Sequence, residues 1–119
     1  MIRIIVAGSR TFNNYPLLKH TLNNFIQQLG ACNSIEIVSG GARGADRFGE
    51  RYAREQGYSL KIFPAHWDLY GKRAGYLRNA EMADYADCLV AFWDCQSPGT
   101  KHMINLAMQK GLKECCIKY

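Results

Sequence analysis

The sequence contains no long hydrophobic run and no recognisable targeting segment. Its longest apolar stretch covers residues 88–93, whereas a helix needs about 20 apolar residues to span a membrane. Close to the N-terminus, Arg3 interrupts an apolar segment of only a few residues, and no small-residue cleavage pattern follows it. We therefore expect a cytoplasmic protein with no membrane partner.

The cysteines lack the spacing of a disulfide framework or a zinc site. There are 5 of them, an odd number, and no two are spaced as C-x-x-C. They are expected to fill the core, with the adjacent Cys115 and Cys116 on opposite faces of a strand. His66 and His102 have no neighbouring metal ligand in the sequence. No metal and no other cofactor is expected.

Composition and charge are those of a folded protein with anionic partners. The 119 residues are 48% hydrophobic and 21% charged, which excludes the low-hydrophobicity, high-charge signature of disorder. A chain of this length is expected to form one domain over residues 1–119. The net charge of +5 at pH 7 favours nucleotides, nucleic acids and acidic proteins as partners, without choosing among them.

Short β-rich runs alternate with helical patterns along the whole chain. Strands are expected at residues 2–7, 35–39, 59–63, 87–94 and 113–119. Helices are expected between Asn14 and Gly30, between Gly44 and Gly57, over 75–86, and from Gly99 to Gly111. Residues 64–76 show neither period and are expected to form a long loop, which makes them a site candidate. The alternation predicts an α/β fold, a Rossmann-like doubly wound domain with a five-stranded, mainly parallel sheet and helices on both faces.

Glycine and polar residues follow three of the predicted strands. The segments are GSRTF (8–12), SGGARGAD (39–46) and WDCQSPGTKH (93–102). Because the carboxyl ends of parallel strands meet at one edge of a sheet, these loops are expected to lie together. Their glycines allow a ligand to approach the backbone, and the helices that follow offer free N–H groups, so an anion is the expected ligand. Tight turns that bind nothing would have the same composition.

Neither glycine-rich loop is a standard nucleotide motif. The spacing of Ser39, Gly41 and Gly44 is that of G-x-G-x-x-G with serine in the first place, but no acidic residue closes the strand at 59–63. The motif G-x-x-x-x-G-K-[ST] is absent. Both ordinary dinucleotide binding and P-loop phosphoryl transfer therefore lose support.

Five stretches together carry a family resemblance. They are GSRTF (8–12), VSGGARGAD (38–46), FPAHWDLYGKRAGYLRN (63–79), ADCLVAFWD (86–94) and SPGTKHMI (97–104). In this order they resemble the YspA-type, cpYpsA-related branch of the SLOG superfamily of Rossmann-like domains. The resemblance implies a pocket for nucleotides or nucleotide-derived ligands, and a link to nucleotide-based signalling and anti-phage conflict systems. It also implies a homodimer as one assembly, since relatives often form dimers.

Two better-understood relatives point in different directions. LOG-type phosphoribohydrolases cleave the base from a nucleoside monophosphate and carry a P-G-G-x-G-T-x-x-E motif. Its counterpart here is residues 97–100, with Met103 in place of the glutamate, so the phosphate-binding half is present and the catalytic carboxylate is not. DprA-type DNA-processing proteins carry a loop similar to residues 40–46 and bind single-stranded DNA.

The candidate site residues come from these loops and from the aromatic and basic segment that precedes residue 80. We expect the ligand to be bound by Gly8, Ser9, Arg10, Ser39, Gly40, Gly41, Arg43, Gly44, Trp67, Arg78, Asn79, Ser97, Gly99 and Thr100. Three carboxylates are catalytic candidates, namely Glu50, Asp94 and Asp46. Each of the three also has a structural interpretation: an exposed helix position, a loop cap and a favourable charge at a helix start.

Three functions remain open from the sequence. The leading hypothesis is a nucleotide-binding pocket, with hydrolysis of an N-glycosidic bond as the reaction if the protein is an enzyme. The alternative is a single-stranded nucleic-acid-binding protein, and a third is a regulatory module that has lost its ligand.

Overall fold

The elements alternate along the chain as the sequence predicts. The computed structural model describes residues 1–30 and 34–119. The elements are β1 (Ile2–Gly8), α1 (Tyr15–Gln28), β2 (Ile35–Ser39), α2 (Ala45–Gln56), β3 (Ser59–Ile62), α3 (Trp67–Tyr70), the 3₁₀ turn η1 (Gly71–Arg73), α4 (Ala74–Tyr85), β4 (Cys88–Trp93), α5 (Pro98–Lys110) and β5 (Lys113–Lys118).

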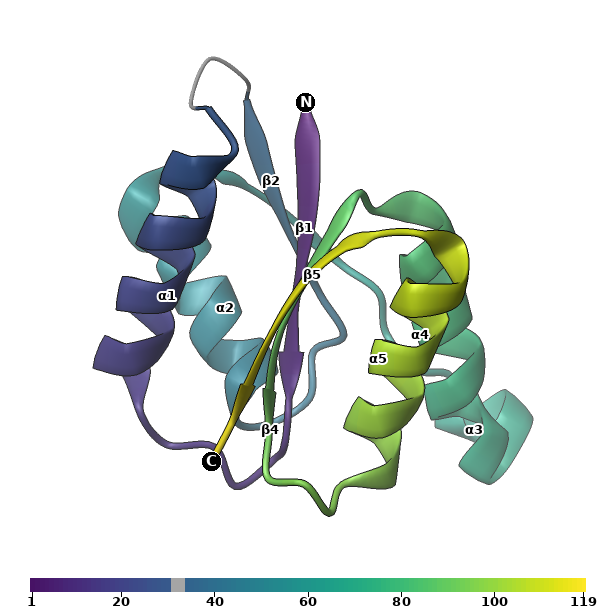
Figure 1. Cartoon of the computed structure of the whole chain (residues 1–119). Helices are drawn as coiled ribbons and strands as arrows, with labels where there is room; N and C mark the ends of the chain where they lie inside the picture. The colour runs from purple at the N-terminus through teal and green to yellow at the C-terminus, as the bar shows by residue number, and fades with distance from the viewer. Residues whose placement is uncertain (31–33) are drawn as a thin grey trace.

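The sheet has five strands in the order β3-β2-β1-β4-β5, and every neighbouring pair is parallel. Helices α1 and α2 cover one face, and α4 and α5 cover the other (Figure 1). The chain therefore leaves the central strand β1 in both directions, which is the doubly wound arrangement. The predicted fold class is confirmed.

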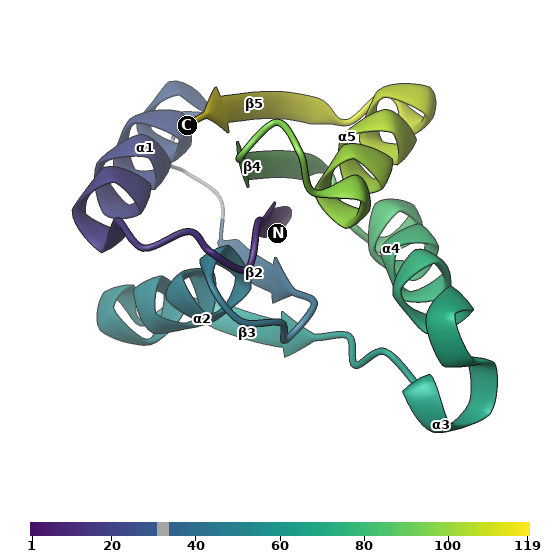
Figure 2. The ribbon, with the colours of Figure 1, turned by 90° about the horizontal axis from the view of Figure 1, so that it is seen from below.

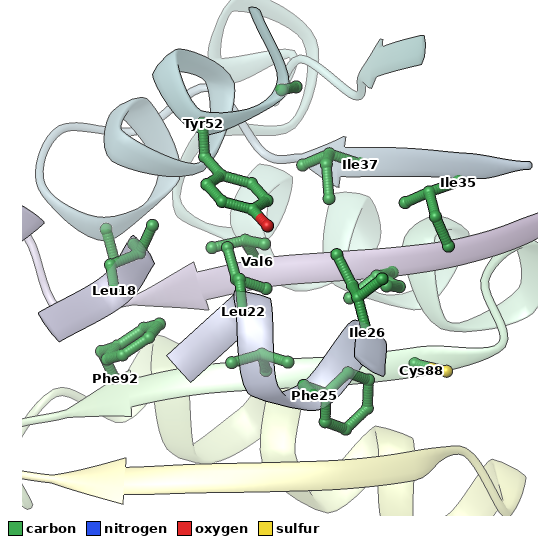
Figure 3. Packing of buried hydrophobic residues seen from close by; sticks show 14 of the residues in the cluster. Val6, Leu18, Leu22, Phe25, Ile26, Ile35, Ile37, Tyr52, Cys88 and Phe92 are labelled. Atoms are coloured by element: carbon green, nitrogen blue, oxygen red, sulfur yellow. The ribbon is translucent and has the colours of Figure 1, made fainter. Parts of the chain in front are cut away.

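The central strands are buried on both faces, which explains their continuous apolar sequence. In β1, Ile4 and Val6 pack under α1 and α2, while Ile5 and Ala7 pack under α4 and α5. Figure 3 shows the first of these two layers, with Leu22 of α1 beside Val6. Since both faces are occupied by packed side chains, a ligand can reach this part of the sheet only at its rim.

Local signals set the ends of the helices. The side-chain oxygen of Asn14 accepts a hydrogen bond from the amide of Leu17 at 3.1 Å and so caps α1, with Pro16 in the first turn. Helices α2 and α5 end at Gly57 and Gly111, both with a φ of 73°. Among the described residues, no helix is long and apolar enough to cross a membrane.

The prediction of a long loop over 64–76 is wrong. Most of that segment is helical, because α3 and η1 lead directly into α4. The carbonyl of His66 accepts hydrogen bonds from the amides of Leu69 and Tyr70, which closes a single turn before Gly71 adopts a φ of 56°. One turn is too short to show a helical period, so the sequence pattern could not reveal it.

The cysteine prediction holds for only part of the set. Cys88 is buried and Cys115 packs against the layer under α1 and α2, but Cys95 and Cys116 are exposed. Strand β5 lies at the edge of the sheet, so its second face has less to pack against than a central strand has. Cys32 lies outside the residues that the structure describes.

Candidate functional site

The loops after β1, β2 and β4 meet at the carboxyl edge of the sheet, the edge seen in Figure 2. A cavity of about 430 Å³ lies there, between these loops and the starts of α4 and α5. Among the predicted ligand-binding residues, those that line it are Gly8, Ser9, Arg10, Trp67, Arg78, Asn79, Ser97, Gly99 and Thr100. Ligand sites commonly have volumes of about 300–1,000 Å³, so the cavity is large enough for a small molecule.

A second cavity, of about 530 Å³, adjoins the first. Among the remaining predicted residues, those that line it are Gly40, Gly41, Arg43 and the catalytic candidate Glu50. Arg10, Ala42, Trp67 and Arg78 line both cavities. The two cavities are therefore neighbours that share a boundary.

Close backbone contact holds the first two loops together. Gly44 has a φ of 78°, and a Cβ atom at this position would lie 2.4 Å from the carbonyl oxygen of Ser9 and 2.7 Å from that of Arg10. No larger residue fits without displacing the loop after β1. Gly44 thus serves the packing of the two loops against each other.

The third loop is tied to the first through Ser9 and Asp94. The amide of Asp94 donates a hydrogen bond to Ser9 Oγ at 3.1 Å. Asp94 Oδ1 in turn accepts from the amides of Gln96 at 2.9 Å and Ser97 at 2.8 Å. These backbone hydrogen bonds lower the pKa of Asp94 to about 2. The carboxylate caps its own loop, and it is not among the residues that line either cavity.

Asp46 is a buried carboxyl group that lines the first cavity. Burial raises its pKa to about 7, and the positive charge of Arg78 and a hydrogen bond from the amide of Ala42 limit the rise. That hydrogen bond, to Asp46 Oδ2, is 3.3 Å long. A carboxyl group with this pKa exists in both protonation states near neutral pH, as an acid or base catalyst requires.

Glu50 lies one turn after Asp46 on α2 and is also buried, not exposed as its structural interpretation from the sequence required. Ser39 Oγ donates a hydrogen bond to Glu50 Oε2 at 2.7 Å and accepts one from the amide of Gly41 at 3.0 Å. Arg54 Nη2 lies 3.8 Å from the other oxygen of Glu50. The Glu50 carboxylate therefore helps to anchor the loop after β2, whose sequence prompted the prediction of an anion site.

Two backbone amides of the loop after β2 already donate hydrogen bonds within the protein. Gly41 donates to Ser39 Oγ and Ala42 donates to Asp46 Oδ2, so these two N–H groups are not free for a phosphate. Two carbonyls of the loop accept hydrogen bonds from arginine side chains that lie outside residues 40–44: Arg78 Nη1 donates to the oxygen of Gly40, and Arg47 Nε donates to that of Gly41. Residues 40–44 thus bring arginine side chains to the rim.

The start of α5 offers a better place for an anion. Ser97 and Pro98 begin the helix, and the first N–H groups of a helix have no partner within it. The side-chain amide of Asn79 fixes this turn to α4, with Nδ2 3.3 Å from the carbonyl oxygen of Gly99 and 3.2 Å from Nδ1 of His102. Gly99 and Thr100 line the first cavity, so a phosphate can lie against the helix start there.

Two exposed aromatic side chains line the same cavity, Trp67 from α3 and Tyr76 from α4. Trp67 was expected from the sequence, whereas Tyr76, Lys72 and Ala42 were not among the expected ligand-binding residues. The signal that could have found Tyr76 is its spacing of three residues from Asn79 in a helix, which places both on one side. Among the described residues, no three histidine, cysteine or acidic side chains come together as metal ligands.

Comparison with known proteins assigns the family. A sequence model of the YspA, cpYpsA-related SLOG family matches residues 2–70, which is more than half of the chain. The chain belongs to this family. The Gene 61 protein of Mycobacterium phage D29 is 33% identical to it over 118 residues, a match that covers 94% of this chain and 93% of the phage protein.

Among solved structures, this SLOG-family chain is similar to DNA processing protein A (DprA) from Streptococcus pneumoniae. The TM-score is 0.75 at 19% sequence identity, and the match covers 98% of this chain and 50% of that one. The chain thus spans half the length of the DprA structure. At this level of identity the likeness establishes the fold and nothing finer.

This SLOG-family chain has an apolar residue, Met103, where the LOG-type motif has its glutamate. Met103 is buried on the first turns of α5 and lines the first cavity. No carboxylate takes its place on that helix face. The buried carboxyl group at this cavity is instead Asp46, which comes from α2 on the opposite face of the sheet.

Proposed function

We propose that the protein binds a nucleotide in the first cavity. The observation that carries the proposal is the convergence of three strand-following loops around a cavity that combines a helix start, arginine side chains and exposed aromatic rings. The helix start and the arginines suit the phosphate of a nucleotide, and the aromatic rings suit its base. The family assignment supports the proposal, because the family resemblance implies nucleotide-derived ligands.

The chemistry of the lining suggests how the ligand lies. The phosphate would bind at Gly99 and Thr100, where free amides and the positive end of the α5 dipole stabilise negative charge. Arg10 adds a guanidinium group that can donate two parallel hydrogen bonds to a phosphate. The base would stack on Trp67 or Tyr76, since every base has a π-face that an aromatic ring can contact.

We also propose N-glycosidic hydrolysis as the reaction that this site is suited to catalyse. The bond between C1′ and the base breaks, the hydroxyl of a water molecule joins C1′, and the base leaves with a proton. Asp46 would carry out the proton transfer, and two observations support this role: its carboxyl group lines the cavity and has a pKa of about 7. Glu50 and Asp94 remain weaker candidates, because their carboxylates are engaged in holding the loops.

Calorimetric titration with AMP and GMP tests the binding proposal. We expect saturable binding by the wild-type protein and a loss of about tenfold in affinity for Arg10→Gln, because one charge-assisted contact is removed. Arg51→Gln is the matched control, since Arg51 pairs with Glu55 on the surface of α2 and its loss changes the net charge equally. If millimolar nucleotide does not bind, or if both variants lose affinity alike, the proposal is wrong.

The reaction is tested separately by chromatography of the free base. Asp46→Asn should abolish base release while AMP affinity stays within about twofold, since an amide has nearly the same shape and cannot donate or accept the proton. Binding without base release by the wild-type protein would leave the binding proposal intact and refute the hydrolysis.

A single-stranded nucleic acid is the second candidate ligand. It is favoured by four arginines around the second cavity, Arg10, Arg43, Arg47 and Arg78, and by the likeness in fold to a protein described as a DNA processing protein. A strand binder should gain affinity with oligonucleotide length and lose it steeply with salt. Equal affinity for a mononucleotide and a decanucleotide would contradict this alternative.

A further inference from the structure

The second cavity is strongly basic, and the proposed binding of a mononucleotide leaves two of its arginines, Arg43 and Arg47, without a role. Four arginines line it, and among the residues that the structure describes Glu50 is the single acidic one in its lining. The Glu50 carboxylate is already bound by Ser39 and lies beside Arg54. The field inside this cavity therefore favours an anion.

Two of the arginines at this cavity, Arg47 and Arg78, hold the loop and still have N–H donors that are not used for its carbonyls. Arg47 uses Nε for the carbonyl of Gly41, and Arg78 uses Nη1 for the carbonyl of Gly40. A guanidinium group has five N–H donors, so both side chains can hold a ligand while they hold the loop. Arg43 is exposed at the tip of the same loop. Because the amides of Gly41 and Ala42 donate to Ser39 and Asp46, these two groups are not available to an anion, and the arginine side chains supply the charged donors here.

The boundary between the cavities determines how a ligand can occupy both. Arg10, Arg78 and Trp67 line each cavity, so two anions on either side of this boundary share two guanidinium groups. Phosphates joined as a pyrophosphate are adjacent, so they suit a single cavity better than two neighbouring ones. Phosphates on either side of a sugar can reach one cavity each.

We propose that the second cavity is a phosphate subsite, and that the ligand is a nucleotide with phosphate groups at two separate positions of its sugar. A nucleoside 3′,5′-bisphosphate is the smallest such molecule. This inference rests on nucleotide binding in the first cavity, and it adds Arg43 and Arg47 as the residues that recognise the second phosphate. Neither of these residues lines the first cavity.

Calorimetric titration with AMP, ADP and adenosine 3′,5′-bisphosphate at one ionic strength tests the inference. The wild-type protein should bind the bisphosphate at least about tenfold more tightly than AMP, as expected for one additional charge-assisted contact. ADP should gain much less, because its second phosphate adjoins the first. In Arg43→Gln and Arg47→Gln the advantage of the bisphosphate should disappear, while the affinity for AMP stays within about twofold.

Arg51→Gln again serves as the control for net charge, and it should keep the full advantage of the bisphosphate. An equal gain for ADP would overturn the assignment of two separate subsites. AMP binding without any gain for the bisphosphate would overturn the second subsite alone and leave the proposed function standing. Absence of binding for all three ligands would overturn both. If Arg47→Gln unfolds the protein because its bond to Gly41 is lost, Arg43→Gln, which removes a side chain at the exposed loop tip, still decides the question.

Discussion

Replacing Asp46 by asparagine should change how the stability of the protein depends on pH. The carboxyl group of Asp46 has a pKa of about 7 in the folded protein because it is buried, compared with 3.8 for the ordinary side chain. At pH values between 3.8 and 7, Asp46 has lost its proton in the unfolded chain but keeps it in the folded protein. The folded state binds more protons, so the free energy of unfolding falls as pH rises through this range.

The size of the effect follows from the two pKa values. A tenfold change in an ionisation constant corresponds to about 1.4 kcal/mol, so ionisation of Asp46 costs about 4 kcal/mol in total, of which about 3 kcal/mol is lost between pH 5 and pH 8. Asparagine does not titrate, and its side-chain oxygen can still accept from the amide of Ala42. The stability of Asp46→Asn relative to the wild type should therefore rise by about 3 kcal/mol over that interval.

Urea unfolding followed by circular dichroism at pH 5, 6, 7 and 8 measures this difference. Titrating groups that do not interact with Asp46 are common to both proteins and cancel in the comparison. Asp68→Asn is the control, because Asp68 is exposed on α3 and is solvated in the folded and unfolded states alike. If the wild type and Asp46→Asn lose stability in parallel, the carboxyl group is not held neutral by burial and its proposed role as an acid fails as well.

Two further predictions concern the loops. Gly44→Ala should destabilise the protein by about 2–4 kcal/mol, because the new Cβ would meet the carbonyl of Ser9. Gly57→Ala is the control: Gly57 has a similar φ, but a Cβ there would have no atom within 4 Å, so it should cost only about 1 kcal/mol. Equal melting temperatures for the two variants would contradict the contact. The hydrogen bonds of Asp94 lower its pKa to about 2, so its carboxyl group should titrate near pH 2 in a ¹³C NMR experiment, and the stability that its ionised form confers above pH 3.8 should be lost as pH falls from 3.8 to about 2. Ser97→Ala removes one hydroxyl partner and should move the midpoint upward. A midpoint near 4 in the wild type would refute the loop-capping role.

The fold could be predicted because its signals are local. The continuous apolar run in β1 reports burial on both faces, and Asn14 and Gly57 mark helix ends within a few residues of the atoms they bind. The family assignment follows from several such stretches in order. The short helix α3 escaped prediction because its single turn is stabilised by two backbone hydrogen bonds that leave no trace in the pattern of apolar residues.

The meeting of the three loops around a cavity could be predicted, but the bonding of the side chains there could not. The glycine-rich loops pointed to the carboxyl edge of the sheet, where the cavity lies, because strand polarity alone determines where they meet. The partners of each carboxylate depend on contacts far apart in the sequence. The hydrogen bond between Asp94 and Ser9 joins residues 85 positions apart, and the burial of Glu50 follows from its packing beside Ser39.

The contact between Gly44 and the carbonyls of Ser9 and Arg10 also bears on how the specificity of such a protein can be redesigned. Since the two segments touch through main-chain atoms, grafting one of them from a homologue into this scaffold would break the fit unless its neighbour is transplanted too. Exposed positions such as Arg43 and Trp67 are under no such constraint. Libraries that diversify these positions and keep the paired backbone intact should yield more folded members than libraries that exchange a single loop.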